Sequence, residues 1–312
     1  MYSPEIIAAL IDDLRARFGL PDDAEVSVEA NPDPSLAGRL DGLRAAGVNR
    51  LSIGVQSFEP HELRVLGRRH SPADVTTAVR AARGAGFANV SVDLIFGVPG
   101  QTEDGWAATL DAAVALDVEH VSCYGLTIEE GTPYAAWFAR DPGVFADDTH
   151  EARLYAIAID RLRVAGFEQY EISNWAKPGF RCRHNALYWA NEPYLGLGVG
   201  AASYLDGVRS THTRNLETYC DAALTGDLIP GESERLEGAA RTGEAIMLAL
   251  RTAEGVDVRA FRERYDIDVL ERYGTVVDEL VAGGMLDAGP AWLRLTERGR
   301  FVANDVCGAF LA

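Results

Sequence analysis

Lone polar side chains end three apolar runs of this chain, and they are its most informative chemical feature. The runs cover residues 26–32, 51–58 and 90–102, and the polar residues are Glu29, Gln56 and Asp93. A polar group near the carboxyl end of a buried strand points into the mouth of a sheet, where ligands bind. We predict that these three side chains form one side of an active site.

A second candidate site lies in residues 184–189, His-Asn-Ala-Leu-Tyr-Trp. An imidazole can ligate a metal ion, so His184 is a candidate ligand. Cys182, two residues earlier, is a conceivable thiolate ligand that the sequence leaves undecided. Alternatively, His184 and Asn185 pin an irregular loop by hydrogen bonds while Tyr188 and Trp189 pack in the core. The residues alone favour this second interpretation.

Glu29, Gln56 and Asp93 must be positioned by strands and helices, which repeated patterns in the sequence predict. The chain begins with a predicted helix over 4–18, and strands are expected to end near residues 29, 56, 96 and 126. Helices are predicted between them, over about 35–46, 71–84 and 103–115, with a further helix over 149–165 that leads toward residues 167–174. Strand ends recur about every 30 residues, which is typical of a parallel α/β sheet. Four such units are too few to close an eight-stranded barrel.

The pattern changes twice further along the chain. The segment 176–237 is rich in aromatic residues and glycine, which predicts irregular structure that packs over or forms a site. Residues 238–312 read as helices, a short hairpin around 285–296 and a last helix, which resembles a winged-helix module. Because Asp and Glu outnumber Arg there, we expect packing or docking of a partner rather than DNA binding. The predicted domains are 1–175, 176–237 and 238–312.

Composition excludes several classes of function. There are 47 acidic and 29 basic side chains, a net charge of -18, which disfavours nucleic-acid backbones and anionic membranes. No run approaches the ~20 apolar residues of a membrane span. The chain has four cysteines, Cys123, Cys182, Cys220 and Cys307, and no two of them are closely spaced in the sequence. This pattern fits a reducing compartment. We therefore expect a cytoplasmic protein.

Four motifs in order now identify a resemblance. They are Glu-Ala-Asn-Pro (29–32), Gly-Val-Gln-Ser-Phe (54–58), Gly-Arg-Arg-His (67–70) and the run 92–102, Val-Asp-Leu-Ile-Phe-Gly-Val-Pro-Gly-Gln-Thr. The chain resembles the oxygen-independent coproporphyrinogen III oxidase family of radical S-adenosylmethionine proteins over nearly its whole length. The motif 184–189 resembles the heme-chaperone branch of that family. The resemblance implies a partial (β/α) barrel, S-adenosylmethionine and heme as cofactors, and an unknown heme-acceptor protein.

The resemblance also assigns roles to individual residues. The residues that it implies for the S-adenosylmethionine pocket are Glu29, Gln56, Arg68 and Asp93, with Thr127 a weaker candidate after the next strand. Carboxylates can hold an amino group or ribose hydroxyls, and Arg68 can pair with a carboxylate. Taken singly, Glu29 or Asp93 reads equally well as a helix cap or an ion pair. In the heme motif, the resemblance implies His184, Asn185, Tyr188 and Trp189, with His184 as the candidate iron ligand.

The sequence departs from the family at its start. The family's first strand, its CxxxCxxC ligands for a 4Fe-4S cluster and its second strand with a glycine-rich turn have no counterpart here. Three thiolates are needed because the fourth iron must stay open for the cofactor. Three hypotheses follow: a heme chaperone that passes heme to an acceptor, a coproporphyrinogen oxidase of porphyrin biosynthesis if the missing segment is restored, or a truncated, non-catalytic remnant. Whether the chain is an enzyme is left open.

Overall fold

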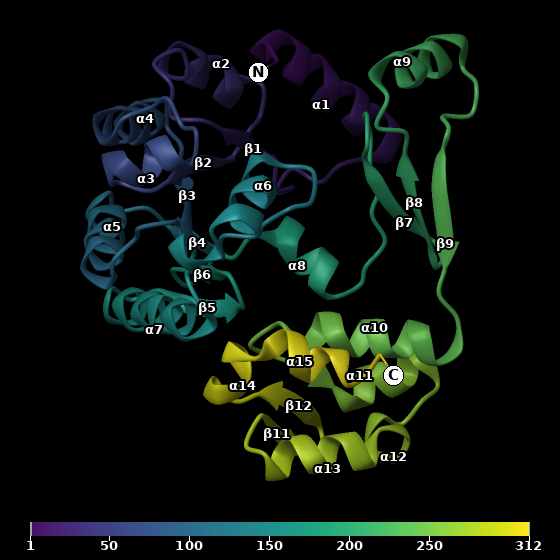
Figure 1. The fold of residues 1–312 in the computed structure, drawn as a ribbon. Coiled ribbons are helices and arrows are strands. Elements are labelled where there is room, and N and C mark those ends of the chain that lie inside the picture. Colours follow the sequence, from purple (N-terminus) through teal and green to yellow (C-terminus); the bar gives the residue numbers. More distant parts are fainter. Residues whose placement is uncertain (1, 312) are drawn as a thin grey trace. The chain divides into compact units, whose positions relative to one another are not determined.

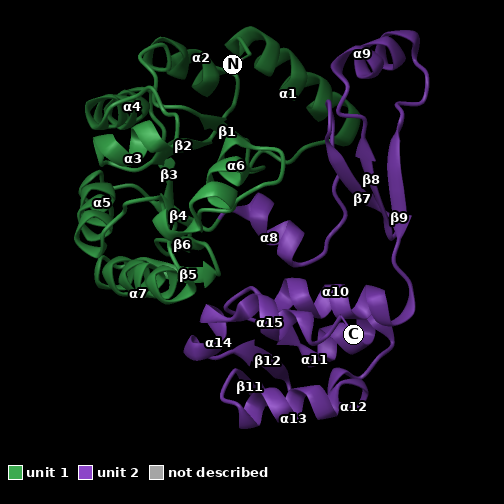
Figure 2. Ribbon diagram, in the orientation of Figure 1, with its two compact units in different colours: residues 1–181 green, residues 182–312 purple. Residues whose placement is uncertain are grey.

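The computed structural model describes residues 2–311, which form two compact units, residues 1–181 and residues 182–312 (Figure 2). The first unit holds a six-stranded sheet with the strand order β1-β2-β3-β4-β6-β5 (Figure 1). Its elements, in chain order, are α1 Pro4–Phe18, β1 Ser27–Ala30, η1 Ala37–Arg39, α2 Leu40–Ala45, β2 Arg50–Gln56, α3 Pro60–Val65, α4 Pro72–Gly84, β3 Asn89–Phe96, α5 Glu103–Ala115, β4 His120–Gly125, α6 Pro133–Arg140, η2 Pro142–Val144, α7 Asp148–Val164, β5 Glu168–Glu171 and β6 Asn174–Ala176.

Strands β1 to β4 are parallel neighbours, as the strand and helix repeat predicts. The helix between β3 and β4 spans the predicted residues 103–115, and Thr102 caps it by accepting from the Gly105 amide. Ser71 and Asp74 form a capping box at the start of α4. These helices agree with prediction because caps and apolar periodicity are local signals.

The sheet ends in a hairpin rather than in a further parallel strand. The pattern toward 167–174 resolves into two short strands, β5 and β6, with β6 antiparallel to both β5 and β4. Only Ile172 and Ser173 separate the two strands, and a connection this short joins antiparallel strands, whereas parallel strands need a long crossover. Periodicity alone did not reveal this reversal.

The two faces of the sheet differ in character. One face of the sheet is apolar and fully buried, and it includes Ile53 of β2, Leu94 of β3 and Val121 of β4. These side chains share one core with residues of α4, α5 and α7, which lie along the outside of the strands (Figure 1). Side chains of a strand alternate between faces. The intervening residues therefore form the opposite face of the sheet. Most of them are polar, and they include Ser27, Glu29, Arg50, Ser52, Ser91, Asp93, His120, Ser122 and Tyr124.

The second unit contains two small antiparallel sheets, β7-β8-β9 and β10-β12-β11. Its elements are α8 Arg183–Trp189, β7 Ala202–Leu205, β8 Val208–His212, α9 Leu216–Thr225, β9 Gly231–Arg235, α10 Gly238–Leu250, β10 Val256–Asp257, α11 Val258–Tyr265, α12 Val269–Arg272, α13 Gly274–Ala282, β11 Leu286–Gly289, β12 Trp292–Leu295, α14 Glu297–Phe301 and α15 Ala303–Gly308.

Regular elements thus occur within 176–237, where aromatic and glycine content predicts irregular structure. The hairpin of β7 and β8 turns at Asp206 and Gly207, whose φ angles are 52° and 74°. An Asp-Gly pair with both φ angles positive is the preferred two-residue hairpin turn. This dipeptide is the signal through which the hairpin is visible in the sequence.

Candidate functional site

Asp93 lies on the polar face of the sheet, between neighbouring strands. Ser52 of β2 donates to its Oδ2 at 3.0 Å and to its Oδ1 at 3.2 Å. Burial raises the pKa of Asp93, the hydrogen bonds from Ser122 and Ser52 oppose that rise, and the Glu29 carboxylate adds to it. Desolvated carboxyl groups with perturbed pKa values are frequent at ligand-binding sites.

Glu29 stands two strands from Asp93, on the edge strand β1. Its Cα pairs with that of Ser52 in the parallel register, and its side chain is exposed. The carboxyl groups of Glu29 and Asp93 therefore face the same side of the sheet, two strands apart, and the charge of Glu29 contributes to the raised pKa of Asp93.

Gln56 and Arg68 both lie near a third residue, Asn31. The Arg68 Nη1 donates to the Asn31 Oδ1 at 3.1 Å. Gln56 adopts a left-handed φ of 67°, and its side chain folds back over Gly54, where a Cβ would lie 2.9 Å from the Gln56 Nε2 and 3.5 Å from the Asn31 Oδ1. Sequence reasoning did not single out Asn31, although it directly follows the strand that carries Glu29 and stands inside the quoted motif.

Gly54 has a testable role beneath this cluster. Gly54→Ala is expected to displace the Gln56 amide, because a Cβ contact of 2.9 Å is shorter than real Cβ contacts. We expect binding of S-adenosylmethionine, measured by isothermal titration calorimetry, to weaken about tenfold, roughly the effect of one misplaced hydrogen-bonding group. Gly38→Ala is the matched control, since nothing lies within 4 Å of its position. Equal affinities of the two variants would contradict a role of Gln56 in the site.

Thr127 follows the end of β4 and is exposed. It lies outside both hydrogen-bonded groups just described. The structure therefore places Glu29 and Asp93 on one face of the sheet and Gln56 and Arg68 near Asn31, and it leaves Thr127 in the loop after β4.

A buried glutamate fixes the loops that follow β2 and β3. The Glu62 Oε2 accepts from the Ser57 hydroxyl at 2.6 Å and from the Gln101 amide at 2.9 Å. The Gln101 Oε1 in turn accepts from the Gly97 amide at 2.8 Å. Burial raises the pKa of Glu62, although both hydrogen bonds oppose the rise. These contacts hold the loops that follow β2 and β3. Sequence reasoning missed the bond that joins the two loops, because Glu62 and Gln101 lie 39 positions apart in the chain.

A buried histidine closes the other end of the polar face. His120 is fully buried, with Nδ1 2.7 Å from the Ser91 hydroxyl and Nε2 2.8 Å from the Tyr170 hydroxyl. Burial first, and then the charge of Arg50, lower its pKa well below the usual value. A neutral imidazole with both nitrogens hydrogen-bonded ties β3, β4 and β5 together and is structural.

The predicted heme motif lies on the short helix α8 in the second unit. His184 and Tyr188 stand one turn apart with ring centroids 4.7 Å apart and ring planes at 90°, and Tyr188 contacts Tyr194 at 4.5 Å in the same manner. His184 is exposed, and Asn185, Tyr188 and Trp189 are half-buried. The motif thus sits on a helix, with its histidine at the surface and no residue of α8 fully buried. Cys182, just before the helix, is buried.

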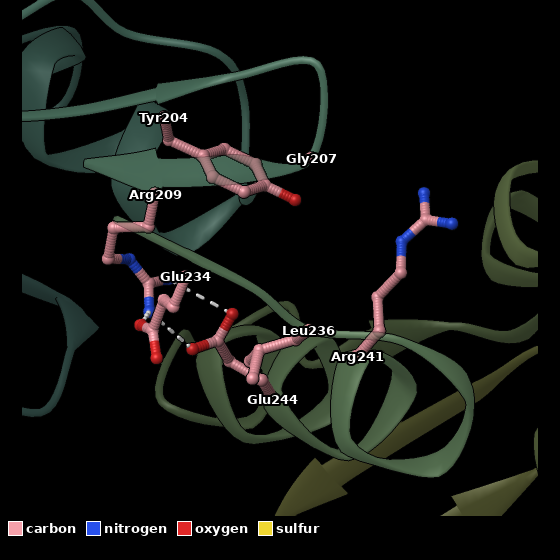
Figure 3. Close-up of a pocket in the computed structure, with 7 residues that line it drawn as sticks. All are labelled: Tyr204, Gly207, Arg209, Glu234, Leu236, Arg241 and Glu244. Atoms are coloured by element: carbon pink, nitrogen blue, oxygen red, sulfur yellow. Dashed lines mark hydrogen bonds and ion pairs between the residues drawn. The ribbon is translucent and has the colours of Figure 1, made fainter. Parts of the chain in front are cut away.

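A small pocket of the second unit involves none of the predicted site residues (Figure 3). Arg209 of β8 reaches Glu244 of α10 through two hydrogen bonds of 2.8 and 3.0 Å and also pairs with Glu234 at 3.1 Å. The hydrogen bond to Glu244 is the main cause of the raised pKa of Arg209. Because both carboxylates face one guanidinium, this cluster joins the β7-β8-β9 sheet to α10 and is not assigned a ligand.

The cysteines do not fit a 4Fe-4S cluster. Three are buried and one is exposed, and burial raises the pKa of Cys123 well above its usual value and that of Cys307 to about 11. Within residues 2–311, no group of three or more His, Cys, Asp or Glu side chains has a geometry that could hold a metal ion. Cluster ligands need accessible thiolates close together. The described residues therefore supply no cluster site.

The parallel strands, with a polar and partly desolvated face, define an α/β fold, and comparison with known proteins gives its class. Residues 2–113 match the model of the radical SAM superfamily, and residues 237–302 match that of the HemN C-terminal domain. The structure resembles coproporphyrinogen III oxidase (HemN) from Escherichia coli, described as a radical SAM enzyme, with a TM-score of 0.84 over 99% of this chain and 74% of the other. At 22% identity this likeness establishes the fold alone.

Two curated relatives narrow the class to a family. The heme chaperone HemW of Bacillus subtilis is 36% identical over 92% of this chain and 76% of its own length. The heme chaperone HemW of Mycobacterium tuberculosis (strain H37Rv) is 37% identical over 98% of this chain and 77% of its own length. The chain belongs to the radical SAM superfamily, in the family of these heme chaperone HemW proteins. The predicted family and branch are confirmed. Among residues 2–311, no helix has the length and apolar character to cross a membrane.

Proposed function

We propose that this chain is a heme chaperone, which binds heme and transfers it to an acceptor protein. The observation that carries the proposal is the exposed His184 on α8, packed edge-on against Tyr188 in a chain whose curated relatives are named heme chaperones. An imidazole at the surface can coordinate iron, and the half-buried Tyr188 and Trp189 can pack on the porphyrin. An exposed site suits a protein that must release its cargo.

His184→Ala tests the proposal. We expect the Soret shift of hemin titrated into the protein to be lost or its affinity to fall at least about 100-fold, because a direct ligand affects binding more than its supporting shell does. The control is His61→Ala, which removes an exposed histidine of α3. A hemin spectrum and affinity that survive His184→Ala would exclude this residue as the iron ligand.

We also propose that the strand-end groups bind S-adenosylmethionine. Asp93 and Glu29, which face the same side of the sheet two strands apart, would hold the ribose hydroxyls or the amino group. Gln56 and Arg68, which both lie near Asn31, would contact the methionyl part, and Thr127 is the outlying candidate. The buried carboxyl of Asp93 and the polar lining around it support the fit. S-adenosylmethionine supplies a 5'-deoxyadenosyl radical when a cluster reduces it. No cluster ligands are present in the described residues, so we derive no radical step and do not propose decarboxylation of coproporphyrinogen.

Further features of the chain remain proposals. We propose that the first unit is a partial barrel and that residues 238–312 form a winged-helix-like module that docks a partner. The winged-helix-like module is supported by the combination of helices α10 to α15 with the small antiparallel sheet β10-β12-β11. The division 1–175, 176–237 and 238–312 stays a prediction beside the two compact units. We also propose a cytoplasmic location, which the four free cysteines support.

A further inference from the structure

The chain that leaves α8 is held by a side chain from α11. The Arg264 Nη1 donates to the carbonyl oxygen of Ala190 at 2.8 Å, and its Nη2 donates to that of Asn191 at 2.6 Å. Arg264 also pairs with Glu192 at 3.0 Å. The last carbonyl groups of a helix lack partners within the helix, and a planar guanidinium can satisfy two of them at once. One side chain thus contacts three consecutive residues directly after the heme motif.

Asn191 forms the turn of the chain that follows α8. It is buried and has a left-handed φ of 53°, a conformation that turns the chain sharply at the end of a helix. Its side-chain amide donates to the Tyr265 hydroxyl at 3.3 Å, next to Arg264 on α11. Both the backbone and the side chain of Asn191 are therefore fixed by the C-terminal module.

A second arginine holds the last residue of the motif. The Arg251 guanidinium lies 5.4 Å from the centroid of the Trp189 ring, and its Nη1 donates to the Asn304 Oδ1 at 2.9 Å. Its Nε is buried and has no hydrogen-bond partner among residues 2–311. Burying this one nitrogen without a partner costs free energy, although the side chain as a whole is only half-buried. Stacking of the guanidinium on Trp189 fixes the orientation of that ring.

We propose that Arg264 and Arg251 are positioning residues for heme, through which the C-terminal module fixes the orientation of α8. The inference rests on the proposed heme-binding function of residues 184–189. Neither arginine contacts heme in this proposal. They act by holding the end of a helix that is too short, at seven residues, to be stable in isolation. The fixed end sets the direction in which His184 and the two aromatic rings are presented.

Hemin titration of the full chain tests this proposal, with Arg264→Ala and Arg259→Ala compared. Arg259 is the matched control because it lies on the same helix and pairs only locally, with Glu263 at 3.1 Å. We expect Arg264→Ala to weaken hemin binding on the order of tenfold, typical of losing a residue that orients a metal ligand, and to shift or broaden the Soret band of the bound state. Arg259→Ala should bind hemin as the parent does.

The Soret band of protein saturated with hemin distinguishes a positioning role of Arg264 from a general effect on stability. A merely structural Arg264 would lower the melting temperature and leave affinity and spectrum at saturation unchanged, and that result would overturn the proposal. If Arg264→Ala does not fold by circular dichroism, Arg251→Met decides: weaker binding with an altered band supports positioning, and unchanged binding overturns it. His184→Ala in the same series separates the two hypotheses, because intact binding there would refute the heme motif itself.

Discussion

Asp93→Asn is expected to stabilise the protein at neutral pH while weakening S-adenosylmethionine binding about 10- to 100-fold. The loss of affinity follows from removing one hydrogen bond to a charged group, worth about 1.5–3 kcal/mol. The gain in stability follows from burial, because the parent pays a desolvation penalty for ionising Asp93 and asparagine does not. Ser52 and Ser122 can still hydrogen-bond to the amide.

The pH dependence of this stability difference has a definite sign. Burial raises the folded-state pKa of Asp93 above the unfolded value of about 3.8, so the folded protein binds more protons between the two values. The free energy of unfolding of the parent therefore falls, relative to that of Asp93→Asn, as pH rises from about 3.8 through the raised pKa. The difference should be near zero in acid and constant once Asp93 is ionised in both states.

Urea unfolding at several pH values and calorimetric titration of S-adenosylmethionine measure the two effects. Asp12→Asn on α1 is the control, since Asp12 is exposed and its replacement should change stability by less than about 0.5 kcal/mol. A stability difference independent of pH would mean that Asp93 is not desolvated in the folded protein. Unchanged affinity would remove Asp93 from the cofactor site while leaving the stability argument intact.

Trp106→Ala is expected to cost about 3–5 kcal/mol, the range for truncating a large buried aromatic residue. Trp106 is fully buried on α5, lies 5.8 Å from the Phe96 ring centroid at the end of β3, and donates to the Leu154 carbonyl of α7 at 2.9 Å. Its removal leaves a cavity and takes away the second hydrogen bond to the Leu154 carbonyl, which keeps its bond within α7. Since whole domains are stable by about 5–15 kcal/mol, this one change should destabilise the first unit severely.

Urea unfolding followed by far-UV circular dichroism measures this loss. Val164→Ala, at an 86% exposed position of α7, is the control and should be nearly neutral. A loss below about 1 kcal/mol for Trp106→Ala would show that the core around α5 repacks, contrary to the close packing expected of protein interiors.

Local signals predicted much of the first unit. The helices over 103–115 and 72–84 follow from caps and apolar spacing, and the parallel order of β1 to β4 follows from the strand and helix repeat. The face that carries Asp93 follows from alternation along a strand. The antiparallel direction of β6 and the left-handed φ of Gln56 could not be predicted from the sequence. Both depend on neighbours that are distant in the chain.

The sequence by itself therefore determined which residues could do chemistry and on which strand ends they stand, since residue type and period are properties of short segments. Only the tertiary structure decided what holds them: Asn31 accepts a hydrogen bond from Arg68, Glu62 ties the loops after β2 and β3, and Arg264 of α11 donates to the Ala190 carbonyl at the end of α8. Each of these is a hydrogen bond between segments far apart in the sequence. Such bonds exist only once packing of the apolar core has brought the segments together, so no local pattern encodes them.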